Sequence, residues 1–485
     1  MRCALLALLV ISCGVAVGQL RNAHWLFCDN HVSFASGSAV VSTQLHGGHN
    51  NAAILSDPVG QLLVYALQDS VHNAMHGPVA NVPGSDPYPP AFQQGLLLLP
   101  WPGSDHDAAY FYNEYAAYLG PPGRCGYSRI DLTAGGGQGA FVGDMTWFMD
   151  SSTCKLTAVP HANGEDYWVL VQRWGTDEII AWQLTTNGLE PQPVVSHCGE
   201  VYSQWVGANE YPMRDGPLAA SYGGDVLAIC AEPSPAEGLD SAIIQVLSFD
   251  PATGSAARIA SIPPPVGNTV DGLEFSPDGS KLYMITTDAV AGGVYSFHQY
   301  DLTTPTEAAI VASHLVLTMA DSDYLFGQPE LQMVLAPDGR IYFENTLAST
   351  WLGVIMAPNE LGSACGLVLE YLELPFTGGC GLPNQCRRYH DSELNTSVSD
   401  QERDRSPQAW PVPATHHVQL SLASMGCFRG TLHMHNATGA LVATRPVVEY
   451  GSTLSVDLQD LPVGLLHIRY DGDYGERCAW KVLKQ

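Results

Sequence analysis

A recurring hairpin phrase is the feature that most limits how this chain can fold. LEFSPDGSKLYM spans Leu273–Met284, and MVLAPDGRIYF follows at Met333–Phe343. In each phrase, strand-forming residues flank Pro-Asp-Gly, where proline presets φ and glycine accepts the positive φ of a tight turn. Looser copies lie at Ala52–Tyr65, Trp101–Tyr115, Val159–Trp174 and Leu218–Cys230. Turns that recur about every 46 to 60 residues indicate a repeat architecture.

A second strand-and-turn phrase follows several copies of the first. It reads IIAWQLTTNG, IIQVLSFDPATG and VYSFHQYDLTT at residues 179–188, 243–254 and 294–304. Two hairpins per repeat give four antiparallel strands, which is typical of a β-propeller blade. A lone sheet of this kind cannot bury both faces, whereas a ring of sheets buries them against one another. We therefore predict an all-β propeller, with an array of Greek-key sandwiches as the alternative.

The number of blades follows from the number of copies. Six copies are visible, and HWLFCDNHVSF at His24–Phe34 adds strands near the N-terminus. These strands are expected to complete a blade with the far end of the chain and to lock the ring. Seven blades are predicted, and six blades are the alternative.

Composition agrees with an all-β chain and limits its partners. Of 485 residues, 48 are glycine and 33 are proline, while only 14% are charged, a balance that favours turns and strands over helices. The net charge of −28 argues against binding to nucleic acid and against electrostatic docking to an anionic membrane. No D-x-D-x-D-G ladder supports a Ca²⁺ site, so we expect no cofactor and no metal.

The N-terminus reads as an export signal. Arg2 precedes the apolar run Leu5–Val10, and the small residues AVG end a signal peptide predicted at 1–18. The alternative is lipoprotein processing at VISC, which would acylate Cys13. The signal is too short to span a membrane, and no later segment is long and apolar enough to do so. We expect a mature protein that is secreted or attached to the outer cell surface.

Cysteine usage predicts disulfides. Ten cysteines remain after removal of the signal, an even number in an oxidising environment. Cys380 and Cys386 are close enough in sequence to close a short loop, and Cys427 and Cys478 form a second plausible pair. The other pairings cannot be deduced from sequence. No C-x-x-C spacing with nearby histidines predicts a zinc site.

A change in composition divides the chain. The predicted propeller covers residues 19–390, and a charged segment with little strand pattern follows as a linker at 391–408. Short strand-like runs resume in 409–485, among them GTLHMHNATGALVATRPV and STLSVDLQDLPVGLLHIRY. This pattern predicts a small β-sandwich.

The last seventy-odd residues resemble the type A sorting domain of the bacterial type IX secretion system. WPVPATHHVQL is similar to the opening motif Y-P-N-P-A-x-x-x-x-x-L, HNATGALV to the D/N-x-x-G-x-x-V turn, and VDLQDLPVGLLHIRY to the L-P-x-G core. KVLKQ is similar to the basic final strand. Val412 and Leu466 depart from the usual asparagine and aromatic residue. The matching residues are Pro413, Gly439, Leu461, Pro462, Gly464, Lys481 and Lys484.

This resemblance implies that the type IX secretion machinery is a partner. It implies export across the outer membrane, removal of the sorting domain and, often, anchoring to surface polysaccharide. A generic immunoglobulin-like module is the alternative. Residues 22–385 also resemble a group of secreted proteins of the same bacteria, through phrases such as NAHWLFCDNHVSFASGSAV and HANGEDYWVLVQRWGTDEIIAWQLTTNG. That group is usually of unassigned function, so the second resemblance implies a fold and a location rather than an activity.

Several polar and aromatic residues are candidates for ligand binding. In HGGHNN, glycines let a ligand approach the backbone, and histidine and asparagine side chains offer contacts. In HNAMH two histidines stand four apart, but the Glu of H-E-x-x-H is missing, which favours a turn or packing role over zinc. HANGEDYW carries a third group, for which a structural role in the hairpin is the alternative. The candidates are His46, His49, Asn50, His76, His161, Asp166 and Trp168.

No catalytic motif is present. The chain has no G-x-S-x-G and no phosphate-binding glycine loop, and GGGQG at 135–139 is expected to be a connection between strands. Carboxylates are abundant, but sequence cannot show whether two of them converge. A non-catalytic binding or scaffold propeller is therefore predicted, with a polysaccharide, a peptide or an envelope component as ligand. The alternatives are a hydrolase that uses the propeller channel and a structural component of a surface layer.

Overall fold

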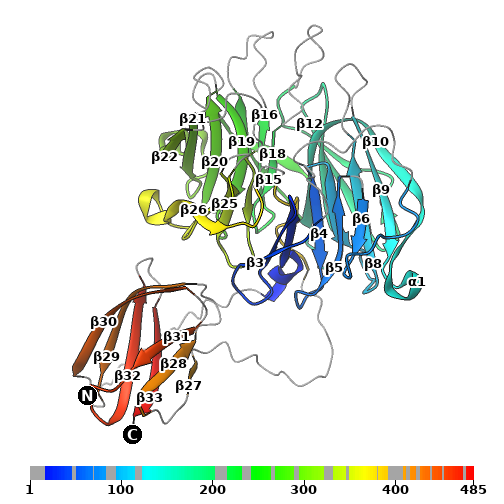
Figure 1. The fold of residues 1–485 in the computed structure, drawn as a ribbon. Coiled ribbons are helices and arrows are strands. Elements are labelled where there is room, and N and C mark those ends of the chain that lie inside the picture. The colour runs from blue at the N-terminus through cyan, green and yellow to red at the C-terminus, as the bar shows by residue number, and fades with distance from the viewer. Residues whose placement is uncertain are drawn as a thin grey trace, which may run out of the picture.

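The computed structural model shows a nearly all-β protein. Two parts follow one another along the chain: seven antiparallel blades arranged as a ring, and a small sandwich (Figure 1). The described residues are 17–45, 51–68, 70–83, 94–114, 123–201, 216–231, 242–263, 268–288, 294–321, 331–345, 349–378, 381–390, 408–410, 415–421, 427–436, 440–450, 453–472 and 477–484.

Blades one to four come from the first half of the chain. Blades one and two have three described strands each, and blades three and four share one continuous sheet. Their strands are β1 (His24–Phe27), β2 (Asn30–Ser33), β3 (Val40–Thr43), β4 (Ala52–Ser56), β5 (Leu62–Leu67), β6 (Ser70–Asn73), β7 (Leu96–Pro100), β8 (Asp107–Asn113), β9 (Gly123–Asp131), β10 (Ala140–Pro160), β11 (Tyr167–Arg173), β12 (Glu178–Thr185), β13 (Gly188–Leu189) and β14 (Val194–His197).

Blades five to seven are regular four-stranded sheets whose strand order follows the sequence. Short helices occupy a few connections: η1 (Val17–Asn22), α1 (Ala134–Gly137), α2 (Glu307–Ala312) and η3 (Gly362–Cys365). The strands are β15 (Leu218–Ala220), β16 (Val226–Ala231), β17 (Ile243–Phe249), β18 (Ala256–Ile262), β19 (Asn268–Phe275), β20 (Lys281–Asp288), β21 (Val294–Asp301), β22 (Leu315–Asp321), β23 (Met333–Leu335), β24 (Ile341–Glu344), β25 (Trp351–Ile355) and β26 (Leu367–Glu373).

One long strand joins blades three and four. The first half of β10 pairs with β9 at the outer edge of blade three, and its second half pairs with β11 as the inner strand of blade four. The register shifts near residue 152, and Ser151 adopts a positive φ of 61° at the crossing. A single strand therefore makes the blade-to-blade connection.

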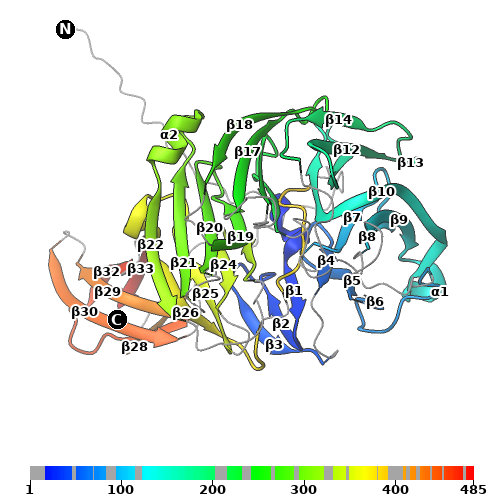
Figure 2. The same ribbon diagram turned by 90° about the horizontal axis from the view of Figure 1, so that it is seen from above.

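Side-chain packing closes the ring between blade one and blade seven. Trp25 and Phe34 of blade one pack against Tyr342 of blade seven, with ring centroids 5.8 and 5.5 Å from that tyrosine. They belong to a buried cluster that also contains Val354. Among the described residues the N-terminal strands form a blade of their own and pair with no strand of the last sheet, so the expectation that they complete a blade with the far end of the chain is wrong. Asn30 of β2 does exchange two hydrogen bonds with the backbone of Phe376, just after β26. Figure 2 shows the blades around the ring.

The two Pro-Asp-Gly phrases are matching hairpins of two blades, as the sequence predicts. The first joins β19 to β20 and the second joins β23 to β24. Gly279 and Gly339 have φ of 71° and 79°, a region that residues with a Cβ rarely adopt. Asp278 and Asp338 accept hydrogen bonds from backbone amides two residues later, which fixes each turn.

The C-terminal part is a β-sandwich, which confirms the predicted architecture. A three-stranded sheet faces a four-stranded sheet around a core that includes Leu420, Leu466, Ile468 and Trp480. The strands are β27 (Gln408–Trp410), β28 (His417–Ser421), β29 (Cys427–His435), β30 (Leu441–Tyr450), β31 (Thr453–Asp457), β32 (Gly464–Gly472) and β33 (Arg477–Lys484).

The expectation that disulfides are the default is wrong for part of the chain. Cys386 is a buried thiol, so the predicted Cys380–Cys386 loop is not formed. Cys125, Cys198 and Cys365 are also buried thiols, because each sits among blade side chains rather than opposite another cysteine. Cys28 is disulfide-bonded. The pairing of Cys427 with Cys478 stays a prediction.

Candidate functional site

The axis of the ring is occupied by the chain itself. After β26 the chain turns into the middle of the blades, and residues 381–390, here called the channel segment, pass between the inner strands. Figure 2 shows this segment in yellow-orange inside the ring. Seven of its ten residues are buried and only Arg388 is exposed, although the segment contains no regular secondary structure. Its polar groups must therefore find partners on the blades.

Asn384 ties the channel segment to three inner strands. Its side-chain Nδ2 donates to the carbonyls of Leu96 on β7 and Leu156 on β10, both at 2.9 Å. Its backbone N–H donates to the carbonyl of Ala52 on β4 at 2.8 Å. An amide with two donors matches two converging carbonyls, which explains an asparagine at this point.

A buried ion pair ties the segment to blades six and seven. The Arg387 guanidinium lies 2.8 Å from the carboxylate of Glu274 on β19, whose side chain is fully buried. Glu274 also accepts from the backbone amides of Leu335 on β23 and of Phe275. Burial raises the pKa of Glu274, and Arg387 opposes that rise. The Glu274 carboxylate is therefore paired and hydrogen-bonded, as a buried charge must be, whereas Arg387 Nε is buried without a hydrogen-bond partner among the described residues.

The N-terminus is held by the same segment. Asn22, directly before the first blade, donates from Nδ2 to the carbonyl of Cys386 at 2.8 Å and accepts from the Tyr389 hydroxyl at 2.9 Å. The Cys386 thiol lies 3.3 Å from the carbonyl of Ala158 on β10. Through these contacts the segment joins η1 to blades two, three, four and six, and the Gly381 amide donates to Glu344 of blade seven at 3.2 Å.

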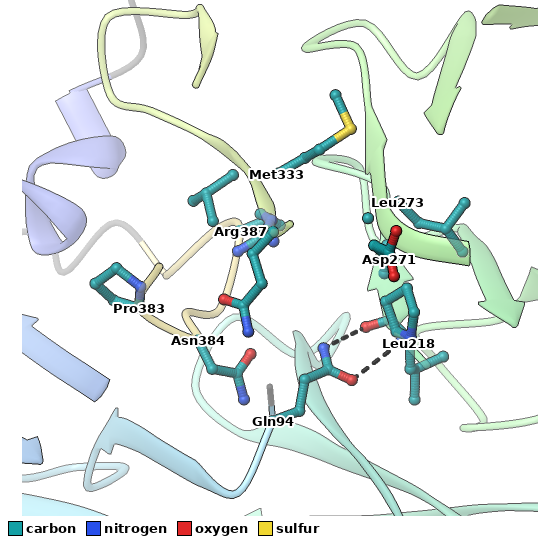
Figure 3. A pocket seen from close by; sticks show the side chains of 13 residues that line it. Gln94, Leu218, Asp271, Leu273, Met333, Pro383, Asn384 and Arg387 are labelled. Carbon is teal, nitrogen blue, oxygen red and sulfur yellow. Dashed lines mark hydrogen bonds between the residues drawn. The ribbon is translucent and has the colours of Figure 1, made fainter. Parts of the chain in front are cut away.

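A small cavity remains beside the segment. It has a volume of about 30 Å³, enough for about two water molecules. Figure 3 shows Gln94, Asp271, Asn384 and Arg387 around it. Gln94 pairs with the backbone of Leu218, donating to its carbonyl at 2.8 Å and accepting from its amide at 2.9 Å. The cavity is a gap in a packed axis and too small for a sugar or a peptide.

Asp271 is the group in this cavity with the strongest acid–base character. Burial raises the pKa of its carboxyl to about 7, and a hydrogen bond from the Thr287 hydroxyl opposes the rise. The neighbouring Gly272 leaves room for β23, because a Cβ there would lie 2.6 Å from the Leu331 carbonyl oxygen. Asp271 can hold or release a proton near neutral pH, but nothing larger than water reaches it within the described cavity.

His161, Asp166 and Trp168 come together around one hairpin. His161 stacks on Trp168 with centroids 5.1 Å apart, and Asp166 accepts from the side chains of Asn163 at 2.7 Å and Gln183 at 2.9 Å. Trp168 donates to the carbonyl of Pro251 at 2.9 Å. These bonds shape the turn between β10 and β11 and attach it to blade five. These contacts give the three residues a structural role in the hairpin. Their role in ligand binding stays a prediction.

The other candidates are placed elsewhere or not at all. His76 lies in the turn after β6, with φ of 62° and its Nδ1 3.2 Å from the Tyr65 hydroxyl, so it is two blades away from Trp168. His46, His49 and Asn50 lie outside the described residues. Among the residues that the structure does describe, no three His, Cys, Asp or Glu side chains are grouped as metal ligands would be.

Sequence reasoning placed residues 381–390 in the propeller but missed their role. The segment has no strand periodicity, and its partners lie up to 367 positions away in the chain. One signal was present in the sequence. Gly-Leu-Pro-Asn-Gln-Cys combines amides and apolar residues without charge just before the charged linker, which is unusual for an exposed connection.

Comparisons with known proteins give no family. No protein-family model and no curated protein matches the chain. Solved structures with some likeness include the periplasmic gluconolactonase of Pseudomonas aeruginosa, at 11% identity, TM-score 0.43, and coverage of 73% of this chain and 93% of that one. Kluyveromyces lactis Hsv2 is 11% identical, with a TM-score of 0.38, and the match covers 69% of this chain and 90% of that one. The extracellular domain of BT4673 from B. thetaiotaomicron is 11% identical, with a TM-score of 0.38, and the match covers 96% of this chain and 57% of that one. None of these likenesses brings an activity to this chain.

Proposed function

We propose that this chain is an exported, non-catalytic propeller that binds an extracellular polysaccharide on the outside of its ring. The channel segment carries the proposal. It occupies the axis, is tied to the surrounding blades through Asn384 and Arg387, and leaves a cavity of about 30 Å³. Among the described residues the axis leaves no room for a polymer, so we place its binding surface on the blades or on their connections.

A half-buried aromatic cluster on blades three and four supports this choice of ligand. Tyr127, Phe148 and Trp182 pack together on β9, β10 and β12, and Trp147 lies on β10 against the same core. The Arg124 guanidinium lies 3.7 Å from the Trp147 ring centroid. Aromatic rings present apolar faces on which a sugar ring can stack, and Arg124, which is also ion-paired with Glu114 at 2.7 Å, places a cation beside one of them for a carboxylate or sulfate group.

The proposal is tested with the full mature chain. It would be incubated with immobilised acidic and neutral glycans, and both retention and the masses of released material would be measured. We expect retention on an acidic glycan with unchanged ligand masses, and about two- to tenfold weaker retention for Trp147→Ala, because stacking on one aromatic ring contributes about 0.5–1.5 kcal/mol. The matched control is Trp351→Ala, which removes a half-buried tryptophan on blade seven. Equal effects of the two variants would contradict the proposal.

A glycan or peptide hydrolase is the second candidate, and Asp271 is the observation that favours it. A carboxyl with a pKa of about 7 is the kind of group that general acid–base catalysis uses. New product masses in the same incubation, lost in Asp271→Asn, would support this candidate over simple binding. If the new product masses persist in Asp271→Asn, the hydrolytic site does not lie at Asp271 in the channel.

Export by the type IX secretion machinery is proposed for the C-terminal sandwich. Lys484 supports the resemblance, because its amine is buried and donates to the carbonyls of Gln459 and Leu461 in the turn before β32. The final basic strand is thereby tied to the L-P-x-G turn that includes Pro462 and Gly464. Lys481 is exposed on β33, while Pro413 and Gly439 lie outside the described residues. A variant that lacks residues 409–485 should stay inside the cells of a host that has the secretion machinery. Unchanged export of this variant would contradict the proposal.

A further inference from the structure

Charge is divided unevenly between the two parts of the chain. Residues 409–485 contain six of the 20 Lys and Arg and six of the 48 Asp and Glu, so they carry no net charge. The whole charge of −28 therefore belongs to the residues before 409. An argument from total charge excludes anionic surfaces for the propeller, but it does not apply to the sandwich.

The outer face of the four-stranded sheet concentrates the cationic and imidazole side chains. Strand register places His435 of β29 opposite His467 of β32, and His467 opposite Lys481 of β33. The next row pairs His433 with Arg469. Residues directly opposite in neighbouring strands have Cβ atoms about 5 Å apart, so these side chains form one contiguous surface. Neither row contains a carboxylate.

Exposed aliphatic residues gather at one end of this same face. Leu465 and Leu483 are direct cross-strand partners and are 38% and 41% exposed. Val463, in the turn that leads into β32, is 75% exposed, and Leu441, opposite His435, is 56% exposed. These four are all of the strongly exposed large aliphatic side chains among the described residues of the sandwich. One acidic group, Asp460, is exposed in the same turn.

We propose that this end of the sandwich, defined by Val463, Leu465, Leu483 and Lys481, docks on an anionic lipid surface. Aliphatic side chains enter the boundary between headgroups and acyl chains, while flanking cations meet anionic headgroups. A soluble glycan fits less well, because aliphatic residues offer no flat ring for a sugar to stack on. The inference goes beyond the propeller's proposed ligand and does not depend on it.

The test uses the full mature chain and co-sedimentation with vesicles. One set is phosphatidylcholine alone, and the other contains about 30 mol% phosphatidylglycerol. We expect at least about tenfold stronger binding to the anionic vesicles, weakened by high salt. This outcome is informative because a protein with a net charge of −28 is repelled by such vesicles unless a local surface attracts it. No binding to anionic vesicles would overturn the proposal.

Variants separate this surface from the rest of the molecule. The double variant Leu465→Ser/Leu483→Ser should lose about tenfold or more in vesicle binding, and Lys481→Glu should lose several-fold. Asp460→Asn should strengthen binding. The matched control is Val142→Asp on β10, which changes a side chain that is 54% exposed in the propeller and should leave vesicle binding unchanged. An equal loss of vesicle binding in Val142→Asp would overturn the proposal. Binding of the protein to a soluble anionic polysaccharide and not to the vesicles would overturn it as well.

Discussion

The propeller and the sandwich are both built of antiparallel strands, but they satisfy their polar backbone in different ways. A sandwich closes on itself, and its core is almost wholly apolar apart from the Lys484 amine. A ring of blades leaves an axis that apolar side chains do not fill. In this protein a polar, irregular segment fills it, through Asn384 and the Arg387–Glu274 pair. The propeller is therefore expected to depend on single polar residues, and the sandwich on packed volume.

Arg387→Ala should have the largest effect and should act on the propeller alone. Removing one partner of a buried ion pair leaves Glu274 charged and unpaired, which costs about 3–5 kcal/mol of unfolding free energy. Chemical denaturation followed by fluorescence and by hydrogen exchange would separate the unfolding of the two parts. Addition of Glu274→Gln should restore part of the loss. A loss of unfolding free energy below about 1 kcal/mol would show that the Arg387–Glu274 pair behaves as a solvent-exposed ion pair.

Leu466→Ala should destabilise the sandwich and leave the propeller unchanged. Leu466 is 1% exposed in the sandwich core, and a buried leucine reduced to alanine costs about 2–5 kcal/mol. The same denaturation curves would report the change. The control is Leu465→Ala, one residue earlier on the outer face, which should cost far less because its side chain is 38% exposed. A shift of the propeller's unfolding would show that the parts are coupled.

Asn384→Ala should cost about 1–3 kcal/mol of propeller stability. The substitution leaves the buried carbonyls of Leu96 and Leu156 without their shared donor. Asn384→Asp should be at least as harmful, because a carboxylate cannot donate to either carbonyl. If Asn384→Asp proves neutral, another group holds these strands together.

Mild acid should weaken the propeller through the half-buried His31 and the buried His298. Burial lowers the pKa of His31 in blade one and of His298 in blade six to about 4. Because the unfolded chain binds these protons near pH 6.5, their contribution to stability is complete above that pH and is lost between about 6.5 and 4. Asp271, whose pKa is raised, acts in the opposite sense.

The histidine contribution is isolated by comparing a variant with the wild type. The Thr286 hydroxyl lies 2.8 Å from His298 Nε2. In His298→Gln the glutamine side chain can still hydrogen-bond to Thr286, but glutamine does not take up a proton. Calorimetry at pH 7.5 and pH 5 should show a smaller loss of propeller stability for this variant. An equal loss would place the acid sensitivity elsewhere.

Sequence was informative wherever a local pattern determined the structure. Pro-Asp-Gly flanked by strand residues predicted the blade hairpins, because proline and Gly279 or Gly339 fix the turn locally. Short strand-like runs in residues 409–485 predicted the sandwich. The axis could not be predicted, because the partners of Asn384 lie 228 and 288 positions away. The thiol of Cys386 was misread for the same reason, since its surroundings come from other blades.

The most direct test of the account is hydrogen exchange of residues 381–390 in the full mature protein. If the segment closes the channel, the amide of Asn384, which donates to Ala52, should exchange as slowly as amides of the inner strands β4 and β7. Exchange as fast as in an unstructured peptide would show that the channel is open. The closed axis, and the non-catalytic function inferred from it, would then be contradicted.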